Sequence, residues 1–393
     1  MKIAFIGQKG IPCTIGGVER YVEVLSTGLA KVGYDVTVYG RDWYVHNNHK
    51  TYEGVKLVTL PSLRTKNLDA ATHTILCILH AAIFGHYDII HINGVGPALF
   101  TGLAKILCPR AKIVTTFHCR DKFHSKWGRF ARIMLSLGER AACRFPDHTI
   151  AISDDLSTHC RNLSAKNLSR IHYGLAVPDK NKLMTPAELE NKFGLRAGNY
   201  FVVVTRLLAH KNIHHIIEAY KMSGVARPLA IVGSGSYSTG YMRELNLMTK
   251  NNTNIKFLGA QQGLTLYSVL ANAFCYLTAS STEGTPFSLL EAAFYSLPVM
   301  VSRIPEHLEV VDLDGLRGWI FPLGSVVTLA QKIKAMDALD EIRRALMGQA
   351  LRAFVENAYS QERLVAETLA VYASLKNFEG FARIIPEQAF EKF

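Results

Sequence analysis

The sequence predicts two doubly wound α/β domains in tandem, each built on a parallel sheet. The chain has 393 residues, of which 49% are hydrophobic and 19% charged, enough for two or three domains with sizeable cores. Short apolar segments alternate with segments whose apolar residues recur at helical spacing. The alternation forms two series, separated over 174–199 by a polar stretch that contains Pro178 and Pro186. We expect this stretch to be a linker with a short helix.

The first series starts with a buried strand over 2–6 that ends at Gly7. Helical spacing predicts a helix over 17–32 that Gly33 stops, and the next strand covers 35–39. This succession is a parallel βαβ unit. The same patterns predict later elements of a first domain over 1–176: strands over 55–60, 89–92, 112–116 and 148–152, and helices over 69–84, after Pro97 and over 127–144.

The second series starts near residue 200 and predicts a second domain over 177–359. Its predicted elements are strands over 200–204, 229–232, 255–258, 273–277 and 299–301, and helices over 212–220 and 286–295. The tail over 360–393 is expected to be helical and to pack back on the first domain. Doubly wound sheets bind ligands at the carboxyl ends of their strands, so we expect the site there.

The basic residues are unevenly distributed. The net charge is +12, from 44 Lys and Arg against 32 Asp and Glu, and residues 1–176 hold 22 of the basic and 12 of the acidic residues. This excess predicts an anionic partner, such as nucleic acid, anionic lipid or a phosphorylated substrate. It is densest over 105–144, where a predicted helix alternates apolar and basic residues. That helix either packs within the domain with a solvated basic face or forms a surface for a lipid-linked acceptor at a membrane.

The cysteines and the N-terminus bear on where the protein works. Seven cysteines lie far apart without metal-binding spacing, which is typical of reduced thiols in a cytosolic protein. The first residues do not resemble a signal peptide, and the chain has no run of 18 apolar residues. We therefore expect a cytoplasmic protein, either free or bound peripherally to the inner face of the membrane.

Three motifs follow predicted strands. Gly16-Gly17-Val18-Glu19 starts the first helix, where backbone amides can approach a phosphate, unless the glycines only serve a turn. Arg206 and Lys211 lie on a strand–helix loop, where they either neutralise a diphosphate or are simply solvated. Glu283 and Glu291 can each accept hydrogen bonds from vicinal hydroxyls, such as those of a sugar and a ribose. Between these carboxylates, the backbone over Gly284, Thr285, Pro286 and Phe287 can donate to the same ligand.

The order and spacing of these motifs resemble glycosyltransferase family 4, whose GT-B architecture has two Rossmann-like domains. The chain is most similar to a bacterial subgroup that opens with Ile-Pro-x-x-x-Gly-Gly-Val-Glu and includes rhamnosyltransferases. The stretch over 117–128 is similar to that subgroup's His-Gly-x-Asp-Trp-x-Arg-x-Lys-Trp motif. It departs from this motif at Cys119, Lys122 and His124. These differences bear on the identity of the donor sugar and the acceptor more than on the fold.

The resemblance implies a role for each site residue. Gly16, Gly17, Arg206 and Lys211 bind the donor diphosphate, while Glu283 contacts the sugar and Glu291 the ribose. His118 faces the sugar near the bond that breaks and joins Glu283, Arg206 and Lys211 in catalysis. Residues expected on the acceptor side are Glu19, Asp121 and Lys126.

The activity that the resemblance implies is retaining transfer of a sugar from a nucleoside-diphosphate sugar to a glycan or lipid-linked acceptor. The expected product is a cell-surface polysaccharide such as lipopolysaccharide, and no metal ion or other cofactor is expected. Asp312-Leu313-Asp314 has the form of a metal-binding motif of another transferase fold, but its position before Gly315 favours a turn.

Two alternatives remain open at the level of sequence. A sugar-nucleotide epimerase shares the double architecture, but it needs no acceptor. A non-catalytic basic module that binds membranes or nucleic acid has only the N-terminal charge in its favour. Because the chain carries no recognised nucleic-acid motif, no nucleic-acid partner is expected.

Overall fold

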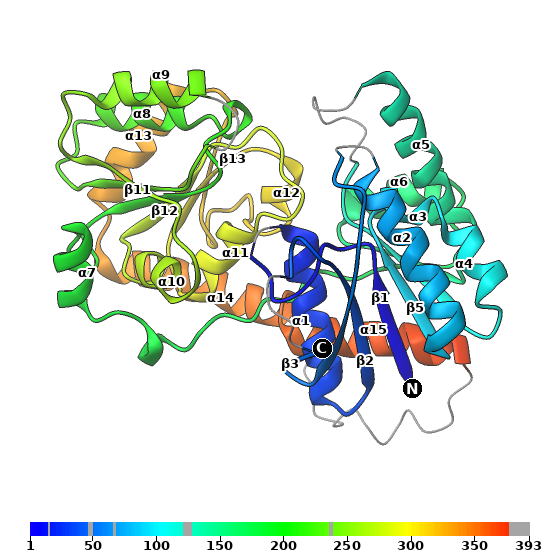
Figure 1. Cartoon of the computed structure of the whole chain (residues 1–393). Helices are drawn as coiled ribbons and strands as arrows, with labels where there is room; N and C mark the ends of the chain where they lie inside the picture. The colour runs from blue at the N-terminus through cyan, green and yellow to red at the C-terminus, as the bar shows by residue number, and fades with distance from the viewer. Residues whose placement is uncertain (15, 46–49, 66–67, 121–127, 236–238, 377–393) are drawn as a thin grey trace. The chain divides into compact units, whose positions relative to one another are not determined.

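The structure is a computed structural model that describes residues 1–14, 16–45, 50–65, 68–120, 128–235 and 239–376. Its contacts divide the chain into two compact units. Unit 1 is Met1–Gly174 with the chain from Tyr359 onward, and unit 2 is Leu175–Ala358. Each unit is a sheet covered by helices (Figure 1), which confirms the predicted fold class of two doubly wound α/β domains.

The sheet of unit 1 has eight strands in the order β3-β4-β2-β1-β5-β6-β7-β8. Their bounds are β1 (Lys2–Ile6), β2 (Asp35–Arg41), β3 (Thr51–Tyr52), β4 (Val55–Leu60), β5 (Ile89–Asn93), β6 (Lys112–Phe117), β7 (His148–Ala151) and β8 (Leu168–Arg170). All neighbours pair in parallel except β3 with β4. Successive strands are added on one side of β1 and then on the other, so the switch point lies between β1 and β5.

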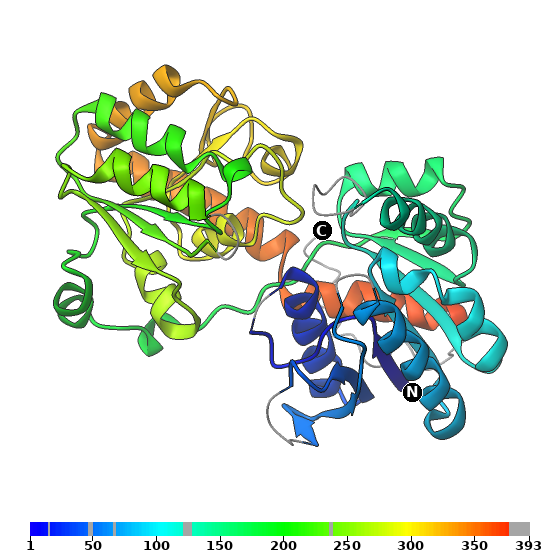
Figure 2. The same cartoon turned by 45° about the horizontal axis from the view of Figure 1, so that its top comes forward.

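Helices cover both faces of this sheet (Figure 2). They are α1 (Gly17–Lys31), α2 (Asp69–His80), α3 (Val95–Ala98), α4 (Thr101–Leu107), α5 (Arg129–Arg144), α6 (Asp154–Asn162) and α15 (Gln361–Lys376). The α1 helix packs on α15, whereas α2, α3, α4 and α5 pack on one another. In α1 the residues at core spacing, Tyr21, Val22, Leu25 and Leu29, are fully buried.

The α15 helix is bonded to unit 1 by side chains far away in sequence. Gln361 Nε2 donates to the carbonyl of Val24 at 2.7 Å. Tyr372 Oη lies 2.6 Å from His91 Nδ1, and both residues are fully buried. The α15 helix thus completes the core over β5.

Unit 2 has a six-stranded, wholly parallel sheet in the order β11-β10-β9-β12-β13-β14. Its strands are β9 (Phe201–Val204), β10 (Leu229–Val232), β11 (Ile255–Gly259), β12 (Cys275–Thr278), β13 (Val299–Ser302) and β14 (Trp319–Phe321). The central strands are buried on both faces, as their continuous apolar sequences require. The switch point lies between β9 and β12.

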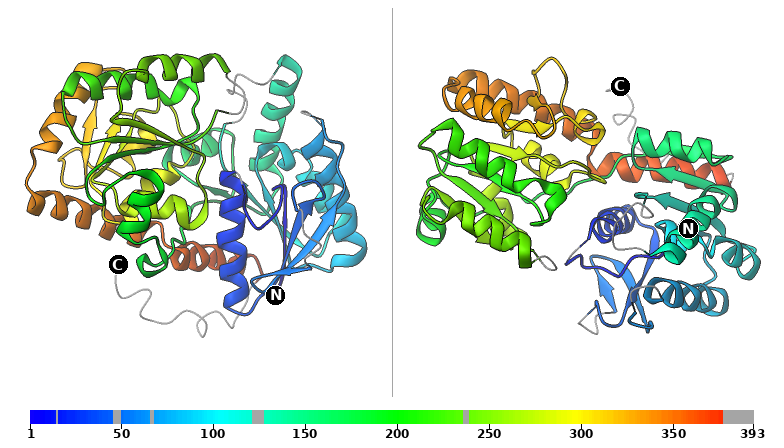
Figure 3. Two further views of the ribbon diagram at one scale, coloured as in Figure 1. Left: turned by 60° about the vertical axis from the view of Figure 1, so that its left-hand side comes forward. Right: turned by 90° about the horizontal axis from the view of Figure 1, so that it is seen from above.

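The helices of unit 2 form two groups (Figure 3). In one group α8 packs on α9 and α13, and in the other α11 packs on α10 and α14. Their bounds, with those of two short helices, are α7 (Pro186–Phe193), α8 (Ile213–Ser223), α9 (Thr239–Thr249), α10 (Gly263–Ala271), α11 (Phe287–Phe294), α12 (Pro305–Leu308), α13 (Val326–Asp337) and α14 (Glu341–Ala358). Within the described residues, no helix is long and apolar enough to cross a membrane.

Several expected boundaries are wrong. The helix predicted over 69–84 ends at His80 and continues as a π-helical turn over Ala81–Gly85, and the strand predicted over 273–277 is Cys275–Thr278. Edge strands β3, β8 and β14 have two or three residues each, too few for a periodic pattern. The unpredicted α6 has a recognisable start, since the Ser153 side chain accepts from the amide of Leu156 at its N-cap.

Candidate active site

Two loops meet at the carboxyl edge of the unit 2 sheet, beside its switch point. One follows β9 and the other follows the neighbouring strand β12. The carbonyl of His210 accepts from the Ser281 amide at 2.9 Å and from the Ser281 hydroxyl at 3.1 Å. Asn212 Nδ2 donates to the carbonyl of Ala279 at 2.9 Å. These bonds fix the loop that carries Lys211 against the loop that carries Glu283.

Lys211 and Glu283 form an ion pair within this junction. Lys211 Nζ lies 2.6 Å from Glu283 Oε2, and the two side chains are 8% and 17% exposed. Lys211 Nζ also donates to the carbonyl of Thr282 at 3.4 Å. Lys211 ends a 3₁₀ turn over Ala209–Lys211, and it is buried, so the alternative of a simply solvated lysine is wrong.

Arg206 differs from Lys211 in its surroundings. It is exposed, and it forms no ion pair with any residue that the structure describes. Its backbone carbonyl accepts from the Leu208 amide at 2.8 Å, which shapes the start of the loop. The two cations of the motif are therefore unequal: one is buried and neutralised, and the other is open to solvent.

The second carboxylate of the motif lies on α11. Glu291 Oε1 accepts from the Tyr267 hydroxyl at 3.1 Å. Burial raises the pKa of Tyr276, and the charges of both Glu283 and Glu291 raise it further, so both carboxylates act on that one hydroxyl. The Tyr276 hydroxyl lies 2.8 Å from Ser288 Oγ. The two glutamates thus share one neighbourhood around β12 and α11.

The backbone between the glutamates leads into α11. In the described part of the chain, the amides of Gly284 and Thr285 have no acceptor. Pro286 is buried at the N-cap, and Phe287 is half-buried as the first residue of the helix. Backbone N–H groups without protein partners can bind negative charge, and two carboxylates beside them can bind hydroxyl groups. The arrangement suits a ligand that carries both.

Sequence reasoning missed His307, which lies beneath this site. His307 is fully buried in α12, with Nδ1 2.9 Å from the carbonyl of Ser302. The Ser302 hydroxyl donates to the carbonyl of Ser280 at 2.6 Å, so the β13 and β12 loops are joined as well. Burial lowers the pKa of His307, and the charges of Glu283 and Lys211 also act on it, in opposite directions. A single histidine in a four-residue helix gives no sequence signal.

In unit 1, the loop after β1 ends at the N-terminus of α1. Gly16 is the N-cap, with φ of 125°, and Gly17 is the first helical residue. Glu19 is 6% exposed, and its Oε1 accepts from the Lys9 amide at 3.1 Å. A Cβ atom on Gly16 would lie 1.8 Å from Glu19 Oε2. The carboxylate therefore shapes the loop, and among the described residues the Gly17 amide at the start of α1 has no backbone acceptor.

A buried polar network lies at the switch point of unit 1. His118 follows β6, is 3% exposed, and has Nε2 3.2 Å from Asn93 Oδ1 and Nδ1 2.6 Å from the Tyr173 hydroxyl. An amide oxygen only accepts, so Nε2 carries the proton and Tyr173 donates to Nδ1. Asn93 Nδ2 reaches Gln8 Oε1 at 3.4 Å. Burial lowers the pKa of His118 to about 3, so its imidazole is neutral.

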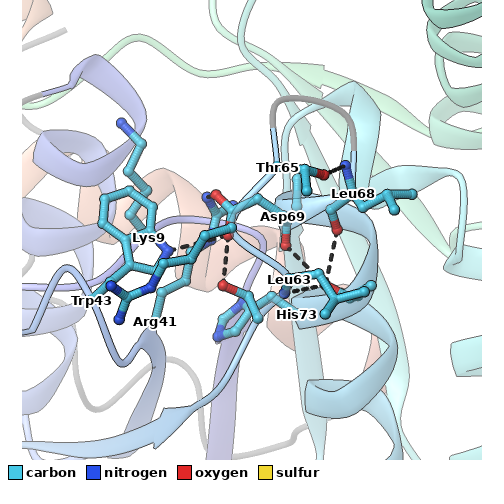
Figure 4. Close-up of polar contacts among 12 residues, drawn as sticks. Lys9, Arg41, Trp43, Leu63, Thr65, Leu68, Asp69 and His73 are labelled. Atoms are coloured by element: carbon cyan, nitrogen blue, oxygen red, sulfur yellow. Dashed lines mark hydrogen bonds and ion pairs between the residues drawn. The ribbon is translucent and has the colours of Figure 1, made fainter.

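A second polar cluster holds the ends of β2 and β4 beside the loop after β1 that carries Lys9 (Figure 4). The Asp69 carboxylate accepts from Arg41 Nη1 at 2.5 Å, Trp43 Nε1 at 3.2 Å and Ser62 Oγ at 2.6 Å. The Arg41 amide donates to the carbonyl of Lys9 at 2.7 Å. Sequence reasoning missed this cluster, whose carboxylate has three protein donors and thus serves to fix the loop.

Two family models match the chain. The model described as Glycosyltransferase Family 4 matches residues 15–176, and the one described as Glycosyl transferases group 1 matches residues 187–354. Residues 15–176 and 187–354 belong to these glycosyltransferase families. The ranges include the unit 1 loop at Gly16 and the unit 2 motifs from Arg206 to Glu291.

Individual glycosyltransferases align over different lengths. The GDP-mannose-dependent monoacylated alpha-(1-6)-phosphatidylinositol monomannoside mannosyltransferase of Corynebacterium glutamicum is 32% identical over 199 residues, 46% of this chain and 50% of that protein. O-antigen chain mannosyltransferase C of Escherichia coli is 22% identical over 387 residues, 95% and 99% of the two chains. The chain spans about half the length of the first curated relatives that it matches.

Solved structures share the fold. Anabaena Alr3699/HepE, crystallised with UDP and glucose, matches with a TM-score of 0.77 at 19% identity, over 95% of this chain and 100% of that chain. This likeness agrees with the GT-B architecture expected for the glycosyltransferase.

Asp121 and Lys126 lie outside the described residues. At Asp312 the expected turn is observed, since its carboxylate accepts from the amide and Nε of Arg317 at 3.1 and 3.0 Å.

Proposed function

We propose that the chain transfers a sugar from a nucleoside-diphosphate sugar to a glycan or lipid-linked acceptor in the synthesis of a cell-surface polysaccharide. The observation that carries this proposal is the Lys211–Glu283 pair, with Glu291 nearby and Arg206 open to solvent at the same sheet edge. Relatives named as mannosyltransferases and a fold neighbour crystallised with UDP support the same donor class.

The reaction breaks the bond between the anomeric carbon and the diphosphate oxygen. A hydroxyl oxygen of the acceptor forms the new bond, its proton passes to the leaving diphosphate, and the nucleoside diphosphate is released. Negative charge develops on the diphosphate, and stabilising such charge is often the largest catalytic contribution. We assign this role to Arg206, Lys211 and the amides at Gly16 and Gly17, without a metal ion and with retention at the anomeric carbon.

The carboxylates bind the remainder of the donor. Glu283 accepts from sugar hydroxyls while it stays paired with Lys211, and Glu291 accepts from the ribose. His118 is neutral and both of its ring nitrogens are bonded, to Asn93 and Tyr173, so it borders the sugar as a fixed neutral ring and does not exchange protons. Glu19 acts on the acceptor side by holding Lys9 through its amide. We assign the acceptor side to Asp121 and Lys126 as well.

The donor base is tested first by thermal shift with UDP, GDP and dTDP. A ligand present at 100 times its dissociation constant adds about 2.7 kcal/mol to the free energy of unfolding. We expect one of the three to raise the melting temperature, in EDTA as well as in magnesium. No stabilisation by any of them would remove the donor assignment, and a strict requirement for magnesium would remove metal independence.

Transfer is then measured with the sugar nucleotides of the selected base, including glucose, mannose and rhamnose donors. Release of nucleoside diphosphate that depends on an added acceptor identifies a transferase. Free, altered sugar released without an acceptor identifies an epimerase instead. Retention is read from the anomeric configuration of the product by NMR.

A further inference from the structure

The first half of α5 exposes a stripe of large apolar side chains. Phe130 is 74% exposed, Ile133 60% and Leu137 42%. Their spacing of three and four residues places all three on one side of the helix. Apolar residues scattered singly over a surface are ordinary, but three adjacent ones on one helix face indicate a contact surface.

The helix packs on its unit through a different set of residues. Gly138, Ala141, Ala142 and Cys143 are the small buried residues of α5. A Cβ atom on Gly138 would lie 2.1 Å from the carbonyl of Val95, so α5 and α3 are already in close contact there. Packing against the described residues of the unit therefore leaves the apolar stripe exposed, and a packing role does not explain it.

Positive charge surrounds the stripe. Arg129, Arg132, Arg140 and Arg144 are all exposed, and none forms an ion pair with a residue in the described ranges. The one acidic residue of the helix, Glu139, is 1% exposed and lies 3.0 Å from His159 Nε2. The exposed face of α5 is thus apolar and basic, with no negative charge of its own.

We propose that this face of α5, defined by Arg129, Phe130, Arg132, Ile133 and Leu137, docks on the surface of an anionic lipid bilayer. Amphipathic helices of this composition lie in the plane of the interface, with the apolar side chains between the headgroups and acyl chains. The arginines then contact lipid phosphates. The proposal does not depend on the proposed function, because lipid binding needs neither donor nor acceptor.

The charge pattern favours a bilayer over other occupants. Two copies of the chain packed symmetrically through α5 would bring the arginines of each copy against those of the other. Nucleic acid would neutralise the arginines through its phosphates but would leave the apolar side chains in water. An anionic bilayer satisfies both the charges and the apolar stripe.

The test is co-sedimentation of the full chain with two kinds of vesicle. One kind is phosphatidylcholine alone, and the other contains about one third phosphatidylglycerol, which is enough for a negative surface potential. We expect binding to the anionic vesicles that weakens as salt is raised. Arg129→Gln with Arg132→Gln is expected to weaken it about 25-fold at low salt, since each basic residue near such a surface contributes about 1 kcal/mol, about a factor of five.

The apolar stripe is tested separately. Phe130→Ser with Ile133→Ser is expected to weaken binding more than tenfold (about 1.4 kcal/mol) at low and high salt alike, with unchanged melting temperature. Matched controls are Arg243→Gln and Ile342→Ser, which alter an exposed arginine and an isoleucine that is 74% exposed in unit 2. Absence of binding to anionic vesicles at low salt, or equal losses in the control variants, would overturn the proposal. Loss of a dimer in the α5 variants, without lipid binding by the parent, would assign the face to a second copy instead.

Discussion

The Nζ of Lys211 lies 2.6 Å from Oε2 of Glu283, at the junction of two loops that carry different parts of the predicted donor site. The lysine assigned to the diphosphate is thus neutralised, without ligand, by the carboxylate assigned to the sugar. A sugar-nucleotide donor that reaches both groups meets a cation and a hydrogen-bonding carboxylate that are already fixed against each other. The pair links binding of the diphosphate to binding of the sugar.

This linkage predicts effects of opposite sign on product affinity. Glu283→Gln removes the partner charge, so affinity for the nucleoside diphosphate is expected to rise about tenfold, or about 1.4 kcal/mol, while turnover falls. Lys211→Met leaves the carboxylate unpaired near the diphosphate, so affinity is expected to fall. Titration calorimetry with the nucleoside diphosphate measures both, and parallel losses in the two variants would contradict the linkage.

The same pair predicts a stability pattern. Lys211→Met is expected to cost about 3–5 kcal/mol of unfolding free energy, because it leaves a largely buried charge without its partner. The double variant Lys211→Met, Glu283→Gln removes both charges and is expected to recover most of that loss. Urea unfolding provides the measurement, and a double variant no more stable than Lys211→Met would show that the pair is not the cause.

Arg206 is predicted to affect the reaction but not the fold. It is exposed and has no described ion-pair partner, so Arg206→Gln is expected to keep the parent melting temperature. Loss of one charge-stabilising group is expected to raise the barrier by about 2–4 kcal/mol. Steady-state turnover with saturating donor measures it, with Arg243→Gln as the control. Unchanged turnover would remove Arg206 from the site.

Gly16 is predicted to tolerate no side chain. Its φ of 125° and the 1.8 Å approach of a Cβ atom to Glu19 Oε2 require the loop to move in Gly16→Ala. We expect a cost of about 1–3 kcal/mol in stability and a loss of transfer activity. Gly102→Ala is the control, since a Cβ atom there meets nothing within 4 Å. Equal behaviour of the two variants would contradict this account of the loop.

Two buried histidines predict how stability depends on pH. Burial lowers the pKa of both His91 and His118 to about 3, with the His118 charge adding to the shift at His91. Unfolding returns them to about 6.5, so below that pH the unfolded state binds more protons. Their contribution is complete well above pH 6.5 and is lost as pH falls, and the loss reaches about 2 kcal/mol per histidine at pH 5.

Urea unfolding at pH 7.5, 6.5 and 5 measures this dependence. His118→Gln is expected to reduce the slope below pH 6.5 by about 1.4 kcal/mol per pH unit, the value for one proton. Burial also lowers the pKa of His73, His172 and His307, so the difference between parent and variant, rather than the parent slope alone, isolates His118. A free energy of unfolding that stays constant from pH 7.5 to 5 would show that the two imidazoles can be protonated in the folded chain.

The sequence predicted the fold class and the motif positions because both depend on local pattern. Continuous apolar strands, helical spacing and glycines at strand ends are visible along the chain. The interactions that complete the site are not local: His118 with Tyr173, His91 with Tyr372, and Lys211 with Glu283 join residues far apart in sequence. His307 and Asp69 have no motif around them, and only the fold shows what they contact.

The central claim is that Lys211 and Glu283 hold the donor of a sugar transfer. The most direct test is transfer of a labelled sugar from the nucleotide selected by thermal shift to added acceptor, in the parent chain and in Glu283→Gln. We predict acceptor-dependent labelling by the parent chain. In the variant, the transfer rate is expected to fall at least about 30-fold, equivalent to about 2 kcal/mol, while nucleoside-diphosphate binding is retained. Equal labelling by both chains, or donor consumption that ignores the acceptor, would contradict the claim.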